Sequence, residues 1–281
     1  MTAQWAMRNG QRGFLMIVIF SFLIAQSASS QQADAAWAGR EKPEETQRAI
    51  GLWQKALKET PDPSNVLINL TKACARMYRQ SKDDKEKAHW VELARTYGAE
   101  AIAKNPDNSD AYAEYAAALG QWAQEHKGIH SVKVVRQSIE MMKKSIALNP
   151  RNPTPHMLLA EMYRQAPNWI SKGDKQKALE QAHLAAQYGG AYALNHVVLA
   201  KALADNGHKD EAIHELQIAI QLKAPADAVP ETKSDQEDAR EMLKKLGASA
   251  AAAPSEESPF AEKSCDKADG VCKDPAAQVA Q

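Results

Sequence analysis

The sequence predicts an all-α fold, a solenoid of helical hairpins, and three observations support this prediction. The 281-residue chain is 44% hydrophobic but only 6% aromatic, and it has few of the β-branched runs that alternate in strands. Small residues recur along the chain at helical spacing. A turn with proline or glycine follows almost every recurrence, so a helix is expected to end there.

The charge balance bears on the class of partner. The chain has 35 Lys and Arg residues against 35 Asp and Glu residues, which gives a formal net charge of zero. A neutral protein has no global field that would attract nucleic acid or an acidic membrane surface. A nucleic-acid partner is therefore not expected.

The N-terminal segment 1–32 has the layout of a secretory signal peptide. Two arginines precede an apolar run at 14–25, and small polar residues follow it. We expect cleavage between Ser27 and Ala35 and a mature protein in the periplasm or outside the cell. A retained membrane anchor is the alternative, but a spanning helix needs ~20 apolar residues, more than this run supplies. No stable membrane insertion is expected after the signal is removed.

The rest of the chain contains five segments with the same spacing. Each carries a small or apolar residue at offsets 0, +4 and +7, with a turn near +12. The first three offsets lie on one face of a helix, where small side chains let a neighbouring helix approach closely. These segments are predicted to be the second helices of hairpins, and they start at Ala49, Ala94, Ser138, Ala178 and Ala212.

Amphipathic segments lie upstream of four of these helices and are predicted to be the first helices of the hairpins. They span residues 65–79, 110–125, 155–165 and 191–206.

The C-terminal part departs from the repeat. Residues 234–246 place four apolar side chains on one face and are predicted to form a helix that caps the last hairpin. Residues 247–281 are rich in Ala, Ser and Pro and are predicted to form a disordered tail. The chain is thus expected to comprise the signal peptide 1–32, a repeat domain of about five hairpins over 33–246, and this tail.

The hairpin pattern resembles the tetratricopeptide repeat (TPR), a 34-residue unit whose first helix carries Leu followed by Gly or Ala. Leu119-Gly120 and Leu159-Ala160 fit this cluster. The starts of the five second helices are 45, 44, 40 and 34 residues apart, so only the last interval has the standard length. The resemblance implies a right-handed solenoid, with the extra residues in longer helices or in the segments between them.

Lengthened repeats of this kind resemble two groups, the periplasmic T component of TRAP-type (tripartite, ATP-independent) transporters and the regulators of microtubule dynamics. The resemblance spans about residues 44–246. It implies a groove or central pore that binds a ligand or a protein, and the export signal favours the transporter-associated group. T components are usually lipoproteins, whereas this chain has no cysteine near the expected cleavage site.

By analogy with the TPR family, the first helices line the concave face, and their inward positions are candidate partner-binding residues. This face changes from basic to acidic to mixed along the chain, which suits an extended peptide with both charges or a small polar ligand. The alternative is that these side chains are solvated helix faces. The candidates are Arg76, Arg79, Glu114, Gln121, Glu125, Met157, Glu161, Arg164 and Lys201, with Trp122 and Trp169 as candidate pocket walls whose alternative role is packing between helices.

The sequence contains no motif for catalysis. A phosphate-binding loop, a dinucleotide-binding turn and a nucleophile elbow are all absent from it. His126 and His130 have the spacing of zinc ligands on a helix, but Gly128 between them weakens a helix, so a loop without metal is expected. We therefore expect no cofactor and no enzymatic activity.

The three cysteines have different expected roles. Cys74 lies between two alanines in a predicted helix, where a small buried residue packs well. Cys265 and Cys272 flank a good turn in the tail and are expected to form a disulfide in an oxidising compartment. The alternatives for this pair are a metal or redox function, or two free thiols.

These features predict an exported, non-enzymatic TPR-like scaffold that holds a protein or peptide partner in its concave groove. One alternative is a T-component-like accessory of a TRAP-type uptake system that binds a small ligand or holds a solute-binding protein. A second alternative is a hydrolase or redox enzyme that uses the histidine pair or the tail cysteines. A third is a purely structural role in envelope assembly.

Overall fold

The computed structural model describes residues 27–126, 128–165 and 174–249. This part of the chain folds into eleven helices and contains no strand. The helices are α2 (Ala28–Ala38), α3 (Pro43–Ala56), α4 (Ser64–Gln80), α5 (Asp84–Lys104), α6 (Ser109–Glu125), α7 (Ile129–Leu148), α8 (Pro153–Gln165), α10 (Lys175–Tyr188), α11 (Ala193–Asp205), α12 (Lys209–Gln221) and α13 (Val229–Lys245).

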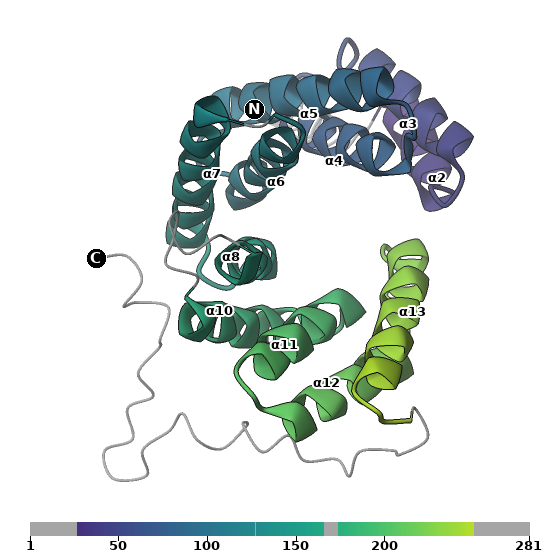
Figure 1. The fold of residues 1–281 in the computed structure, drawn as a ribbon. Helices are drawn as coiled ribbons and strands as arrows, with labels where there is room; N and C mark the ends of the chain where they lie inside the picture. Colours follow the sequence, from purple (N-terminus) through teal and green to yellow (C-terminus); the bar gives the residue numbers. More distant parts are fainter. Residues whose placement is uncertain (1–26, 127, 166–173, 250–281) are drawn as a thin grey trace, which may run out of the picture.

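The helices pair as five hairpins, which confirms the predicted helical solenoid. The pairs are α2 with α3, α4 with α5, α6 with α7, α8 with α10, and α11 with α12. Helix α13 packs on both helices of the last pair, as expected for a cap. The hairpins follow one another around a curve, so that α13 comes back to the side of the molecule where α2 and α3 lie (Figure 1).

The spacing of small residues sets how closely the helices approach. All fifteen residues at the three inner offsets of the five predicted second helices are buried. Two of them are serines whose hydroxyls bond to the partner helix: Ser138 Oγ donates to the carbonyl of Ala116 at 2.7 Å, and Ser145 Oγ donates to that of Ser109 at 2.8 Å. A larger side chain at these positions would separate the two helices of the hairpin.

Most of the additional residues of the long repeats lie in longer helices. Helices α5 and α7 have 21 and 20 residues, whereas α11 and α12, in the unit of standard length, have 13 each. Helix α5 begins with a side-chain cap. Asp83 accepts the backbone N–H groups of Lys85 and Glu86 at 2.9 and 3.0 Å, which satisfies two free donors of α5.

The repeated turns share one geometry. The side-chain oxygen of Asn105 accepts the N–H of Asp107 at 3.2 Å, and that of Asn149 accepts the N–H of Arg151 at 3.1 Å. Gly207 ends α11 with φ of +87°, a left-handed conformation that favours glycine.

The structure differs from the prediction at the two ends of the repeat domain. Helix α2, the first helix of the first hairpin, was not assigned from the sequence, and its residues 28–32 fall inside the segment predicted as signal peptide. Ser27 Oγ caps it by accepting the N–H of Ser30 at 3.2 Å. Helix α13 starts at Val229, five residues before the predicted cap, because Pro230 fits the first turn of a helix.

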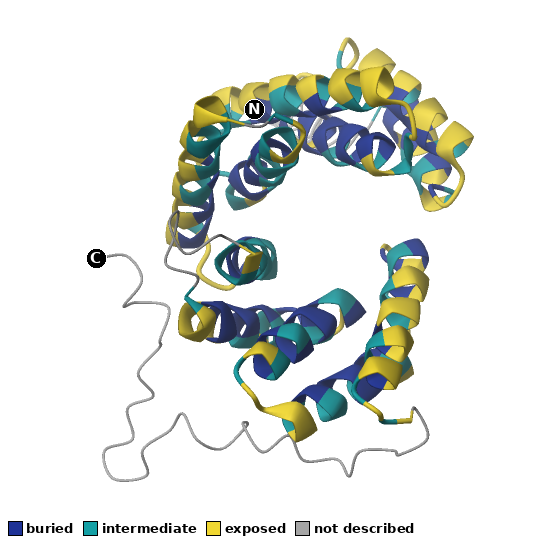
Figure 2. Cartoon of the chain, in the orientation of Figure 1, coloured by how far each residue is buried: buried dark blue, intermediate teal, exposed yellow. Residues whose placement is uncertain are grey.

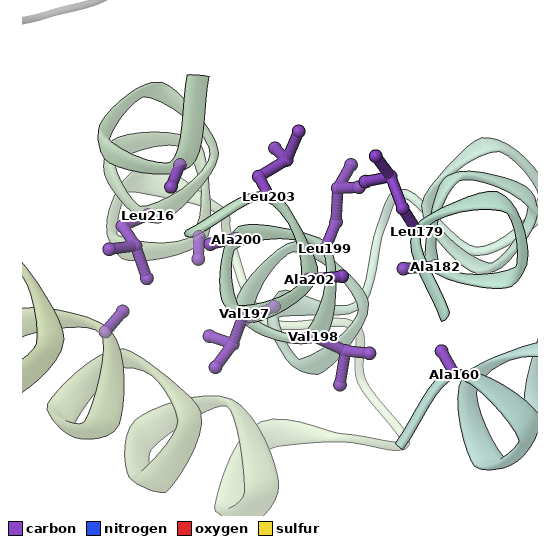
Figure 3. Close-up of a cluster of buried hydrophobic side chains, with 14 of the residues drawn as sticks. Ala160, Leu179, Ala182, Val197, Val198, Leu199, Ala200, Ala202, Leu203 and Leu216 are labelled. Atoms are coloured by element: carbon purple, nitrogen blue, oxygen red, sulfur yellow. The ribbon is translucent and has the colours of Figure 1, made fainter. Parts of the chain in front are cut away.

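The buried residues form an inner layer that follows the curve of the solenoid (Figure 2). The largest cluster spans α8 to α13 and is centred on α11 (Figure 3). There the side chains of Val197, Val198 and Leu203 are each only 1% exposed. Within the described ranges, none of the helices is both long and apolar enough to cross a membrane.

Candidate binding cavity at the centre of the ring

Side chains from the two ends of the solenoid meet and close it into a ring. Arg40, in the turn after α2, is 3% exposed and reaches α13. Its Nε donates to Glu231 Oε1 at 2.8 Å, and its Nη2 contacts Glu231 Oε2 at 2.5 Å and the carbonyl of Asp227. Such paired bonds between guanidinium and carboxylate are the strongest polar contacts that proteins make.

Further side chains of both ends complete this seam. Arg76 on α4 donates to Glu231 Oε1 at 2.6 Å and to the carbonyl of Arg40 at 2.7 Å. Lys233 on α13 pairs with Glu41 at 2.9 Å in a more exposed position, and Tyr192 donates to Asp227 at 3.2 Å beside the seam. Burial raises the pKa of Glu231, but Arg40 and Arg76 outweigh it and lower the pKa overall.

The inner side of the ring has a cavity of about 810 Å³ that is partly open to solvent and is lined by residues of α4, α6, α7, α8, α11 and α13. Its charged lining comes from α4, α6, α8 and α13. The charged side chains are Arg76, Arg79, Glu114, Glu161, Glu231 and Asp235.

An apolar wall faces the same cavity. It consists mainly of Met142, Met157, Leu158, Met162 and Leu194, from α7, α8 and α11. The small residues of α6 complete this wall. They leave open space in the cavity, since a Cβ added at Gly120 would meet nothing within 4 Å. Three methionines give this wall a surface that adapts to ligands of different shape.

Six of the nine candidate groove residues line this cavity: Arg76, Arg79, Glu114, Gln121, Met157 and Glu161. The other three lie elsewhere. Glu125 accepts the hydroxyl of Tyr78 at 2.6 Å, Arg164 pairs with Asp205, and Lys201 lies near Asp235. The register taken from the TPR pattern therefore points most first-helix residues inward.

The environment of the cavity shifts several pKa values. Desolvation, and next the charge of Arg76, lower the pKa of Arg79, although the residue as a whole is exposed. Burial, with repulsion by Asp238 and Glu231, raises the pKa of Asp235 to about 6, while Lys201 opposes this shift. Outside the cavity, burial and the bond to Glu125 raise the pKa of Tyr78 to about 12. Strong shifts in a concave site mark it as a functional candidate.

Of the two candidate tryptophans, the structure describes Trp122, which does not extend this wall. Trp122 does not line the cavity. Its Nε1 donates to Glu92 at 2.6 Å. Its ring stacks on His126 with 3.9 Å between the ring centroids, and the Arg95 guanidinium lies over the ring at 4.8 Å. Its position on α6 turns it toward α5, so it packs between helices instead of facing the cavity. Trp169 lies outside the described residues.

The remaining chemical candidates that the structure describes, His126, His130 and Cys74, occupy ordinary structural positions. His126 ends α6 and His130 is exposed in the first turn of α7. Cys74 is fully buried, and burial raises the pKa of its thiol to about 12, so it stays protonated at neutral pH. The described residues include no group of three or more ligands suited to a metal ion. Cys265 and Cys272 lie outside the described residues.

The contribution of α13 to the cavity was not predicted from the sequence. Pro230, Glu231, Ser234 and Asp235 all line it, and Arg40 holds α13 in place. Since Arg40 and Glu231 are 191 residues apart, no local pattern could pair them. The only available signal was the acidic first turn of the predicted capping helix.

A family model described as regulator of microtubule dynamics protein 1-3 matches residues 29–169, which is just over half of the chain. No curated protein matches the chain.

Among solved structures, the chain is similar to TTC0263, a thermophilic TPR protein of Thermus thermophilus. The TM-score is 0.57 at 18% identity, covering 76% of this chain and 98% of that one. Two structures of MamA match at TM-scores of 0.42 and 0.41 with 15% and 16% identity, covering 79% and 80% of this chain and 99% and 98% of theirs. TTC0263 supports the fold alone at this identity. The family match and the hairpin architecture together place the chain in the regulator of microtubule dynamics protein 1-3 family, as a TPR-like helical repeat protein.

Proposed function

We propose that the protein is an exported, non-catalytic binding protein that holds a peptide segment in its central cavity. The observation that carries this proposal is the convergence of first-helix side chains from α4, α6 and α8 on one cavity of about 810 Å³. TPR-like repeat folds are scaffolds for protein binding, and the concave lining is where the first helices present their side chains.

The lining fits a peptide better than a flat protein surface. The cavity volume lies in the range of sites that enclose most of a small ligand, about 300–1,000 Å³. Charges of both signs can orient a polar backbone or charged side chains. The methionine wall can accommodate apolar side chains.

A site-specific crosslink tests this proposal. We would place a photoreactive phenylalanine at Met157, inside the cavity, and in a separate variant at Glu100, on the exposed face of α5. Irradiation in the source cells should give a defined crosslinked peptide from Met157 only. Adding Gly120→Trp, which fills open space in the lining, should abolish the product. Equal products from Glu100, or a product that survives Gly120→Trp, would contradict the proposal.

Export is part of the proposal and has its own test. Helix α2 begins at Ala28, and Ser29, Ser30 and Ala33 are buried, so late cleavage would remove folded residues. We therefore expect cleavage close to Ser27. N-terminal sequencing of the protein from the envelope fraction checks this, and an intact N-terminus in the cytoplasm would refute export.

A small-molecule ligand, as in the T-component-like alternative, is the second candidate. The size of the cavity and its closure at the seam favour it. Native mass spectrometry of protein from the envelope fraction should then show a retained ligand mass, and the Gly120→Trp variant should lack that mass.

A further inference from the structure

The cavity contains two charged side chains whose charges the ring itself does not pair. Six charged residues line it, and four of them have ion-pair partners: Arg76 with Glu231, Glu114 with Lys72 at 3.7 Å, and Glu161 with Arg164 at 3.6 Å. Within the described part of the chain, Arg79, which is exposed, and Asp235, which is half-buried, make neither a hydrogen bond nor an ion pair, and the opposite charges of Glu114 and Lys201 act on them only at longer range. One is a cation and the other an acid.

These two groups come from opposite sides of the seam. Arg79 lies near the end of α4, and Asp235 lies one turn after Glu231 on α13. Glu231 influences the pKa of both but cannot neutralise Arg79, because its two carboxylate oxygens already accept bonds from Arg40 and Arg76. The cavity therefore presents an available cation and an available acid to whatever occupies it.

The remainder of the lining defines the body of the occupant. Met157, Leu158 and Leu194 offer apolar contacts in the same cavity. A ligand that complements all three features has an anionic group, a cationic group and apolar substituents. A free peptide with apolar side chains has this composition, since its two termini carry the opposite charges.

We propose that the cavity binds short free peptides with apolar side chains, with the terminal carboxylate bonded to Arg79 and the terminal ammonium bonded to Asp235. This inference rests on the proposed peptide-binding function and makes it specific. An internal segment of a protein has no free termini to offer.

Calorimetric titration with Leu-Leu-Leu at pH 7.5 tests the inference. We expect binding to the wild-type protein, with about tenfold weaker binding when the peptide is N-acetylated or C-amidated, as loss of one charged hydrogen bond implies. A series from Leu-Leu to five leucines should show an optimum, because an extended chain spans only about 3.3–3.6 Å per residue.

Two variants assign the ends of the peptide. Arg79→Gln should weaken Leu-Leu-Leu about tenfold but leave binding of the C-amidated peptide unchanged. Asp235→Asn should weaken Leu-Leu-Leu but leave binding of the N-acetylated peptide unchanged. Exposed positions provide matched controls, Arg48→Gln on α3 and Glu237→Gln on α13, which should bind as the wild-type protein does. Circular dichroism verifies that each variant is folded.

The outcomes separate this inference from the proposed function. Absence of binding by the whole peptide series overturns the inference, as does equal binding of the acetylated, amidated and free peptides. If the Met157 crosslink still yields a peptide segment in that case, the binding function stands and its ligand is an internal segment. If the crosslink also fails, the proposed function falls as well.

Discussion

The two halves of the ring bury their side chains differently. From α8 to α13 one continuous cluster of fifteen buried residues joins the helices. From α2 to α8 the buried residues divide into three clusters. Helix α11 has eight buried residues among 13, whereas α5 has four among 21.

This difference shows what the lengthened repeats change. Helix α11 is surrounded by α8, α10, α12 and α13, so it is buried on several sides. Helices α5 and α7 form an outer layer that contacts the inner helices along one narrow stripe, and their additional turns face solvent. Lengthening a repeat therefore adds surface to the outer helices more than it adds core.

The largest expected effect comes from cavities in the two cores. Leu216→Ala in the C-terminal half and Leu70→Ala in the N-terminal half each remove a fully buried side chain. Each should lower the free energy of unfolding by about 2–5 kcal/mol. Hydrogen exchange should show that Leu216→Ala loosens α10 to α13 together, whereas Leu70→Ala loosens only α2 to α5. Matching exchange patterns would refute the separation between the buried clusters of the two halves.

A close approach in the N-terminal half gives the next effect. A Cβ at Gly98 would lie 2.9 Å from Tyr115 Cδ2 and 3.1 Å from its Cα, so Gly98→Ala should destabilise by about 1–3 kcal/mol. Gly51→Ala is the matched control, because a Cβ there meets nothing within 4 Å and alanine favours the helix. Urea denaturation should give opposite signs for the two variants. A stable Gly98→Ala variant would show that α5 and α6 can separate freely.

The seam joins the two halves, and Glu231→Gln tests how strongly. The change leaves the buried Arg40 guanidinium without its carboxylate, which should cost about 1–3 kcal/mol given that Glu231 is partly exposed. Amides of α13 should exchange faster. Glu41→Gln, which breaks only the exposed pair with Lys233, should change stability by less than about 1 kcal/mol. If both variants behave alike, the buried contacts do not hold the ring closed.

The smallest expected effect is a dependence on pH from Asp235. Its folded-state pKa, about 6, exceeds the ordinary value of 3.8, so the folded protein binds more protons between these values. Stability should therefore fall as pH rises from about 4 to about 6 and then stay level. The charged groups that act on this carboxyl, Glu231, Asp238 and Lys201, are present in both proteins, so the difference between wild type and Asp235→Asn isolates Asp235. We expect a difference on the order of 1 kcal/mol from urea denaturation, and a flat difference would contradict the raised pKa.

Much of the fold and part of the site could be predicted from local patterns. Small residues such as Ala94 and Ser138 mark one face of a helix, so their burial follows from helical periodicity. The inward direction of Arg79 and Glu161 follows from the same register. Trp122 could not be placed in this way, because its position between α6 and α5 depends on how far one helix is rotated against the other.

The sequence by itself determined the helices other than α2, their pairing into hairpins and the stripes along which they pack, because these depend on spacings within about forty residues. Only the tertiary structure decided that the solenoid closes. Small rotations from one hairpin to the next accumulate along the chain, and their sum brings Arg40 to Glu231 across 191 residues. That closure turns an open groove into a cavity and leaves Arg79 and Asp235 inside it with charges that the ring does not pair.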